Sequence, residues 1–309
     1  MVQKKRVVLM RYNIAVAADN NYFVPMYVML VSLFTNNENS SYNLYVLHKE
    51  IKDENKQALT ILASKYNCTV EWLNISDVQT GSFYTSHYIT EAAYYRIYIP
   101  YLIPQSIDRV LYLDCDMLVI GNIAELYNTS FDDYALAAVA EAANYSEKWL
   151  NIPDGYPMFN SGVLLLNLPL WRRERYADEL IQNINIRKEK YLIYDQDALN
   201  EFFYNNVKLI HPKWNFQTAI YDPNKYVVKK KYGIDFDEIN KEACIIHFTG
   251  HTKPWHFKCT HPYRKLYIQY TYSTPYKTFI QKPGIRLVVD KYISWAIHKI
   301  ERIIAKLNY

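Results

Sequence analysis

The segment that decides the fold of this chain is Arg109-Val110-Leu111-Tyr112-Leu113-Asp114-Cys115-Asp116. Its first five residues are mostly apolar and are typical of a buried strand, and two carboxylates follow where that strand reaches solvent. Residues i and i+2 of a strand point to the same face, so Asp114 and Asp116 can converge on one cation. Carboxylate oxygens suit magnesium or manganese. The alternative is that these acids only end a strand and cap a turn.

An Asp-x-Asp pattern alone is a weak signal, because Asp195-Gln196-Asp197 and Asp235-Phe236-Asp237 repeat it. The first of these precedes Ala198-Leu199-Asn200, where an aspartate is a conventional helix N-cap. A cap accounts for one of the two aspartates. It does not account for both aspartates together with Gln196.

Length and composition predict one main α/β domain with an appendage. The chain has 309 residues, half of them hydrophobic, and no apolar run approaches the ~18 residues that span a bilayer. The basic start, residues 1–6, precedes an apolar run too short for a secretory signal, so we expect a cytoplasmic location. The 4 cysteines are irregularly spaced, which favours reduced thiols over disulfides or a zinc site.

Charge and glycine content exclude several classes of protein. The net charge is only +4, and the excess lies in the last part of the chain, so we expect no nucleic-acid binding. The 7 glycines form no Gly-x-Gly-x-x-Gly and no Gly-x-x-x-x-Gly-Lys pattern. This argues against dinucleotide-binding and P-loop phosphate cradles.

Hydrophobic periodicity predicts alternating strands and helices, the pattern of a mostly parallel, doubly wound sheet flanked by helices. The expected strands are 13–17, 44–47, 68–73, 110–113, 135–140, 163–167 and 244–248, and the expected helices are 23–34, 53–65, 90–100 and 169–190. The region 204–243 has poor periodicity and is interpreted as loop-rich.

Ligands of such sheets bind beyond the carboxyl ends of the strands. Asp19, Asn21 and Glu141 join the Asp114–Asp116 pair at such ends. His247 closes the last strand, and two carboxylates with a neutral imidazole form a manganese site with open positions for phosphates. A satisfied core histidine is the alternative interpretation of His247.

Two further segments carry groups suited to a phosphorylated sugar. Gly250 can bring backbone close to phosphates, and Lys253 can act as a point charge on their oxygens; a solvated lysine is the alternative. Phe159-Asn160-Ser161-Gly162 places an amide and a hydroxyl at a strand entrance. Such groups suit sugar hydroxyls, although an ordinary turn would use the same residues.

Together these segments resemble the ordered motifs of family 8 glycosyltransferases, most closely the bacterial lipooligosaccharide galactosyltransferases and their glucosyltransferase relatives. The resemblance covers about residues 12 to 260. It is carried by Ala17-Ala18-Asp19-Asn20-Asn21-Tyr22, residues 109–116, Phe159-Asn160-Ser161-Gly162-Val163, Tyr194-Asp195-Gln196-Asp197-Ala198-Leu199-Asn200 and His247-Phe248-Thr249-Gly250-His251-Thr252-Lys253-Pro254-Trp255.

The resemblance implies a GT-A catalytic domain over residues 1–260. The last part of the chain, 261–309, lies outside the resemblance and is expected to be a basic, aromatic, helical segment. The resemblance also implies a retaining enzyme that uses UDP-galactose or UDP-glucose with Mn²⁺, or alternatively Mg²⁺, and a glycan acceptor that is lipid-linked, cell-wall or protein-linked. Matched motif by motif, the metal ligands are Asp114, Asp116 and His247, the uridine contacts Ala17, Asp19 and Asn21, the diphosphate contacts Gly250 and Lys253, and the donor-sugar contacts Arg96, Asn160, Asp195 and Gln196. Asp195 and Gln196 are the expected catalytic residues near the anomeric carbon.

One departure bears on sugar selection: Glu141 stands where the family's galactosyl enzymes typically carry Asp, so the transferred hexose is left open. Two competing classes are a phosphatase of the haloacid-dehalogenase type and a non-catalytic sugar-nucleotide binding protein. The first fits poorly, because the chain has no Gly-Asp pair and its Asp-x-Asp comes late. The second would lose metal or sugar contacts that are all present here.

The segment 285–307 is predicted to be an amphipathic helix, with apolar positions at helical spacing and mostly basic residues between them. Its positive face favours peripheral contact with an anionic membrane surface. Packing of the apolar stripe on the catalytic domain or on a partner subunit is the alternative.

Overall fold

The protein is described from a computed structural model, which describes residues 10–77, 91–143, 150–187, 190–221 and 232–282, with Val289, Tyr292, Ile293 and Ile297. The chain divides into two compact units, Met1–His247 and Phe248–Tyr309. The predicted domain boundary near residue 260 stays a prediction. Most of the predicted helix at 285–307 lies outside the described residues.

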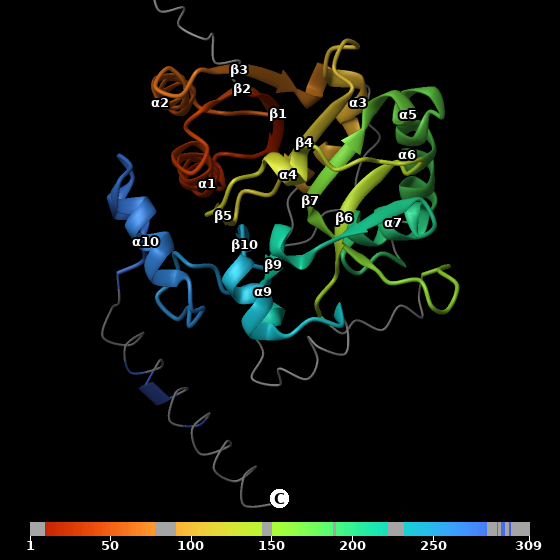
Figure 1. The fold of residues 1–309 in the computed structure, drawn as a ribbon. Helices are drawn as coiled ribbons and strands as arrows, with labels where there is room; N and C mark the ends of the chain where they lie inside the picture. Colours follow the sequence, from red (N-terminus) through yellow and green to blue (C-terminus); the bar gives the residue numbers. More distant parts are fainter. Residues whose placement is uncertain are drawn as a thin grey trace, which may run out of the picture. The chain divides into compact units, whose positions relative to one another are not determined.

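The first unit is built on a seven-stranded sheet with the strand order β3-β2-β1-β4-β7-β6-β8 (Figure 1). Every neighbouring pair is parallel except the two that involve β7, which runs antiparallel to both β4 and β6. The strands are β1 Met10–Ala17, β2 Ser40–His48, β3 Cys68–Asn74, β4 Arg109–Leu113, β6 Leu136–Ala140, β7 Phe159–Asn167 and β8 Val207–Ile210. The predicted mostly parallel α/β sheet is therefore confirmed.

A second sheet of three strands has the order β5-β10-β9. Its members are β5 Met117–Val119, β9 Phe216–Gln217 and β10 Ile245–His247. β10 pairs antiparallel with β5, in a register that sets His247 opposite Met117. This pairing brings the end of β10 next to the acidic segment that follows β4.

Helices flank the large sheet, as predicted, with two differences in detail. Their bounds are α1 Phe23–Thr35, α2 Asp53–Ala63, α3 Ile99–Leu102, α4 Ala124–Tyr127, α5 Leu168–Arg173, α6 Tyr176–Arg187, α7 Tyr194–Phe203 and α9 Phe236–Glu242, and α10 Arg264–Tyr272 belongs to the second unit. The helix expected at 90–100 is mostly a 3₁₀ segment, η2 Glu91–Tyr98, with α3 after it. The helix expected at 169–190 is two helices, because Arg175 takes a left-handed φ of +55° between α5 and α6.

The region 204–243 contains more regular structure than the sequence indicated. β8 pairs in parallel with β6 at the edge of the large sheet, and β9 joins the small sheet. Each is too short for periodicity to reveal, since β8 has 4 residues and β9 has 2.

A large buried core holds the first unit together, and it includes Tyr98, Trp171 and Phe203, all buried. Its sheet side comes from inward-facing residues of the central strands, such as Tyr112 and Leu164. In the part of the chain that the structure describes, no helix is long and apolar enough to cross a membrane.

Candidate metal and sugar-nucleotide site

The site lies at the point where the strand order of the large sheet reverses. From β1 the chain moves to β2 on one side, whereas β4, on the other side of β1, is reached only after β3. Such switch points open a crevice beyond the carboxyl ends of the two strands, where ligands bind. Ala17 ends β1 and Leu113 ends β4, so the predicted uridine and metal residues stand at the carboxyl ends of these two neighbouring strands.

The Asp19 carboxylate organises the turn between β1 and α1. Its Oδ1 accepts the backbone N–H groups of Asn21 and Tyr22, each at 2.9 Å. The buried Cys115 thiol donates to the Ala17 carbonyl at 3.1 Å and so joins the end of β4 to the end of β1. The structure places Ala17, Asp19 and Asn21 at the predicted edge, and their contact with uridine stays a prediction.

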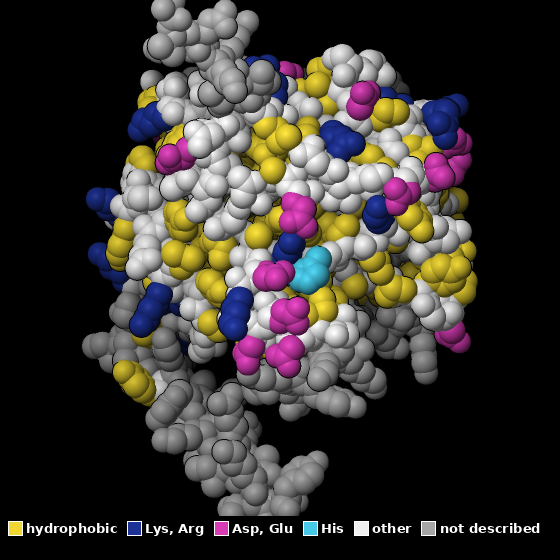
Figure 2. Space-filling view, viewed as in Figure 1, with side chains coloured by type: hydrophobic (Ala, Val, Ile, Leu, Met, Phe, Trp, Pro, Cys, Tyr) yellow, Lys and Arg dark blue, Asp and Glu magenta, His cyan; other side chains and the backbone are white. Residues whose placement is uncertain are grey.

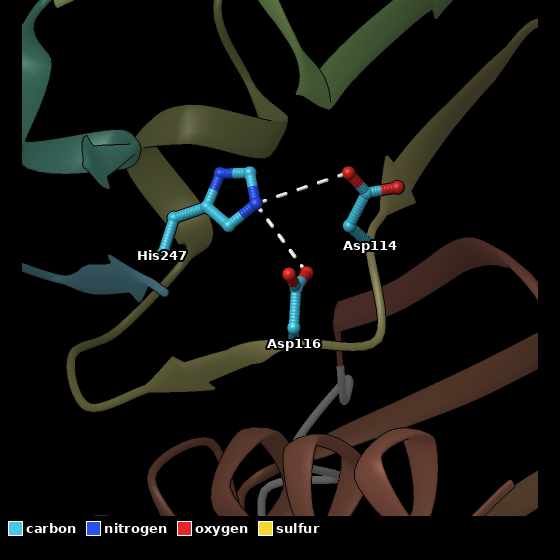
Figure 3. Close-up of side chains that lie close together, drawn as sticks. All are labelled: Asp114, Asp116 and His247. Atoms are coloured by element: carbon cyan, nitrogen blue, oxygen red, sulfur yellow. Dashed lines mark ion pairs between the residues drawn. The ribbon is translucent and has the colours of Figure 1, made fainter. Parts of the chain in front are cut away.

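Asp114, Asp116 and His247 form a compact cluster (Figure 3). His247 Nε2 lies 3.4 Å from Asp116 Oδ1 and 3.9 Å from Asp114 Oδ2. One ligand atom from each of the three residues lies within 4.8 Å of the others, and among the described residues no further group of three meets this criterion. Two carboxylates and an imidazole form a donor set suited to a divalent transition metal, so these residues fit the predicted ion.

Gly162 makes room for this cluster. A Cβ at Gly162 would lie 2.4 Å from His247 Cε1 and 2.8 Å from Asp114 Oδ2. Gly162 lies in β7, and its carbonyl accepts the Asp114 backbone N–H at 2.9 Å. The glycine next to Asn160 and Ser161 therefore serves close packing and has no flexible-turn role.

Arg96 connects the metal cluster to the predicted sugar residues. Its buried guanidinium pairs with Asp114 Oδ1 at 2.9 Å and Asp195 Oδ2 at 3.2 Å, and it donates to the Ser161 carbonyl. Burial opposes the charged guanidinium, but Asp114 and Asp195 outweigh that effect and raise the pKa of Arg96. The ring of Tyr112 lies 4.4 Å below the guanidinium carbon and completes its enclosure.

The charges of this site favour a cation. Asp114 and Asp195 pair with the one guanidinium of Arg96, and Asp116 lies beside His247. Three carboxylates with one guanidinium leave an excess of negative charge that a divalent ion would balance. Figure 2 shows several Asp and Glu side chains exposed on one face of the molecule. Burial raises the pKa of the Asp195 carboxyl to about 6, against the opposing effect of Arg96.

The predicted sugar residues Asn160 and Gln196 share a buried hydrogen-bond network with Glu141. Glu141 Oε2 accepts from Asn160 Nδ2 at 2.9 Å and from Gln196 Nε2 at 3.0 Å. Gln196 Oε1 accepts from Asn160 Nδ2 and from the Ser161 N–H, each at 3.1 Å. Because β7 is antiparallel, Asn160 at its start lies at the same edge as the end of β4.

The N-cap role expected for one aspartate of Asp195-Gln196-Asp197 is not observed, because Ile193 is the N-cap of α7 and the helix has no side-chain cap hydrogen bond. Asp197 lies in the first turn of α7 and is structural in a different way. Its Oδ2 accepts the N–H groups of Leu192 and Ile193, just before α7, at 2.7 and 2.8 Å. Asp195 instead faces Arg96 and Ser161, whose hydroxyl donates to it at 3.1 Å. The structure thus brings Arg96, Asn160, Asp195 and Gln196 together, and their contact with a donor sugar stays a prediction.

Sequence reasoning missed two residues beside β9. Asn215, which is fully buried, bonds to Asn160 and His247. Gln217 accepts from the Ala142 N–H at 2.8 Å and donates to the Ala140 carbonyl at 2.9 Å, so it fixes the backbone on both sides of Glu141. The available signal was the apolar–polar alternation of Trp214-Asn215-Phe216-Gln217.

Gly250 and Lys253 belong to the second unit. Gly250 has a left-handed φ of +88°, which favours glycine. The Lys253 ammonium donates to the Phe248 carbonyl at 2.9 Å. Their predicted contact with a diphosphate stays a prediction.

The mostly parallel sheet, with Asp114, Asp116 and His247 at its switch point, has the architecture of a GT-A fold. The profile of the Glycosyl transferase family 8 matches residues 13–259. The chain belongs to this family, and the phosphatase alternative is thereby set aside.

Three similar proteins illustrate this membership. General stress protein A of Bacillus subtilis is 35% identical over 282 residues, which cover 88% of this chain and 97% of that protein. The lipopolysaccharide 1,3-galactosyltransferase of Salmonella typhimurium is 27% identical, over 86% of this chain and 79% of that one. The crystal structure of galactosyltransferase LgtC in complex with donor and acceptor sugar analogs has a TM-score of 0.70 at 24% identity, and the likeness covers 88% of this chain and 98% of LgtC.

Proposed function

We propose that this protein is a metal-dependent, retaining hexosyltransferase that moves galactose or glucose from a UDP-sugar to a glycan acceptor. The observation that carries the proposal is the cluster of Asp114, Asp116 and His247, joined through Arg96 to Asp195. Transfer of a sugar from a nucleotide diphosphate uses a metal site beside the diphosphate and a buried carboxylate near the sugar. The similarity to lipopolysaccharide galactosyl- and glucosyltransferases supports these two hexoses.

In this proposal the three metal ligands hold Mn²⁺, with Mg²⁺ as the alternative. When bound, the ion supplies Lewis-acid stabilisation of the charge on the β-phosphate as UDP departs. Lys253 and Gly250 contact the same diphosphate, and Ala17, Asp19 and Asn21 contact the uridine.

Arg96 has two tasks that follow from its contacts. It orients Asp195 by an ion pair and it keeps that carboxylate ionised within a buried setting. The Asp195 carboxylate and the Gln196 amide then lie at the sugar side, where positive charge develops at the anomeric carbon. Retention by two displacements and retention by front-face attack are both compatible with this arrangement.

We also propose that the segment 285–307 attaches the protein to the inner face of the cell membrane, which accords with a cytoplasmic location. The support is its basic, amphipathic sequence. The acceptor would then be a glycan presented at that surface, with lipid-linked, cell-wall and protein-linked glycans as the candidate classes.

The test is release of UDP from a panel of UDP-sugars with Mn²⁺, with and without candidate acceptors. We expect one UDP-hexose to be turned over, and Asp116→Asn to abolish turnover. The matched control is Asp237→Asn, because Asp237 belongs to the exposed Asp-x-Asp at the start of α9. Binding of a UDP-sugar without UDP release would identify a non-catalytic binding protein instead. Full activity in a chelator would contradict metal dependence.

A further inference from the structure

Asn215 is a fully buried amide between the metal cluster and the sugar residues. It lies between the 3₁₀ segment η4 Pro212–Trp214 and β9, which runs parallel to β10 and places Gln217 beside His247. Its Oδ1 lies 2.9 Å from His247 Nδ1, and its Nδ2 donates to Asn160 Oδ1 at 2.8 Å. Asn215 is therefore the link between His247 and Asn160.

Neighbouring groups that only donate or only accept hydrogen bonds determine which end of the Asn160 amide is the oxygen. The backbone N–H of Gly162 can only donate, and it lies 3.0 Å from the Asn160 oxygen. The carboxylate of Glu141 accepts from the Asn160 nitrogen. Contacts at both ends thus orient the Asn160 amide. Its oxygen must therefore accept a hydrogen bond from the amide nitrogen of Asn215.

The orientation of Asn215 then determines that Nδ1 of the His247 ring carries a proton. With its nitrogen directed to Asn160, Asn215 presents its oxygen to Nδ1 of the imidazole, so Nδ1 must carry the proton. In the neutral imidazole with this tautomer, it is the Nε2 lone pair that faces Asp114 and Asp116. A histidine that ligates a metal commonly has its other ring nitrogen held in this way.

We infer that Asn215 is a positioning residue that fixes His247 in the Nδ1–H tautomer and so prepares Nε2 for a divalent cation. The inference rests on the proposed metal site. It adds that the metal side and the sugar side are joined through Asn160, a residue of the predicted sugar set. Without Asn215, the imidazole would revert toward the Nε2–H tautomer that free histidine prefers, and its proton would stand where the cation binds.

The first test reads the tautomer directly, without metal. Full-length ¹⁵N-labelled protein is studied by long-range ¹H–¹⁵N correlation at a pH of about 8.5, where an ordinary imidazole is neutral, and His247 is assigned by comparison with His247→Gln. We expect the Nδ1–H pattern in the wild type and a shift toward Nε2–H in Asn215→Leu. An Nε2–H pattern in the wild type would overturn the inference, even if no Asn215 variant folds.

The second test is Mn²⁺ affinity by calorimetry. We expect Asn215→Leu to bind Mn²⁺ about 10- to 100-fold more weakly, and Asn215→Asp, which keeps an acceptor at Nδ1, to recover most of that loss. The control is Asn37→Leu, because Asn37 is also buried but bonds to the backbone of Leu33, Gly121 and Ile123; it should leave the affinity unchanged.

The outcomes separate this inference from the proposed function. Wild-type protein with the Nδ1–H tautomer and no Mn²⁺ binding would overturn the metal site itself. Wild-type binding with equal affinity in Asn215→Leu, or equal weakening in the Leu and Asp variants, would overturn the role of Asn215 and leave the metal site standing.

Discussion

Replacing Gly162 with alanine should displace the metal ligands while leaving the fold in place. The added Cβ would lie 2.4 Å from His247 Cε1 and 2.8 Å from Asp114 Oδ2, whereas an ordinary contact begins at 3.4 Å, so the imidazole would have to retreat by about 1 Å. Overpacking of this kind costs about 1–3 kcal/mol of stability. Metal sites tolerate shifts of only about 0.2 Å in ligand distance, so Mn²⁺ affinity should fall steeply.

Gly121→Ala provides the matched control. There the added Cβ would lie 2.7 Å from Cys244 Sγ and 3.0 Å from its Cβ, so the steric cost is similar but the metal ligands are not touched. Thermal unfolding and Mn²⁺ calorimetry are measured for both variants. We expect both to lose stability and only Gly162→Ala to lose Mn²⁺ affinity; unchanged affinity in folded Gly162→Ala would refute the packing argument.

Four further predictions concern the titration of two buried groups, catalysis and the C-terminal segment. Burial raises the pKa of Asp195 from its ordinary 3.8 to about 6, so the unfolded state loses this proton first and stability should fall as the pH rises from about 4 to about 6. In metal-free protein Asp195→Asn should remove that part of the pH dependence, and an unchanged dependence in urea unfolding would contradict this. Asp195→Asn and Gln196→Ala should each reduce the rate of sugar transfer by orders of magnitude, while calorimetry shows that UDP still binds. An equal loss of UDP affinity would indicate that both residues have a structural role instead. Burial lowers the pKa of His261 to about 4, so stability should fall by about 2 kcal/mol from pH 7 to pH 5 as the unfolded state takes up the proton, and His261→Gln should remove that fall; an identical fall in the variant would refute the assignment. Full-length protein should sediment with anionic vesicles at low salt and a chain ending at Pro283 should not, and equal binding by both would reject the membrane role of 285–307.

The parts of the site that the sequence could predict are those that lie at ends of regular strands. An apolar run followed by two acids marks the end of β4, and His247 ends β10, so their chemistry and place at one edge follow from local pattern. The sugar residues were grouped through the family's motifs, and the structure brings Arg96, Asp195 and Gln196 together as expected.

The remaining features depend on contacts between distant segments. The antiparallel direction of β7 is set by its pairing within the sheet. This direction brings Asn160 to the edge of the sheet where Asp114 and Asp116 lie. Asn215 lies in a stretch whose strand is only 2 residues long, so its partners are set by packing with β10 and β7. No glycine signals the break between α5 and α6, because Arg175, a residue other than glycine, takes the positive φ there.

The most direct test of the account is an anomalous-difference map from crystals grown with Mn²⁺ and UDP. We predict one manganese peak within coordination distance of Asp114, Asp116 and His247 Nε2, with the diphosphate of UDP on its open side. Bound UDP with manganese elsewhere, or with no manganese at this cluster, would contradict the central claim.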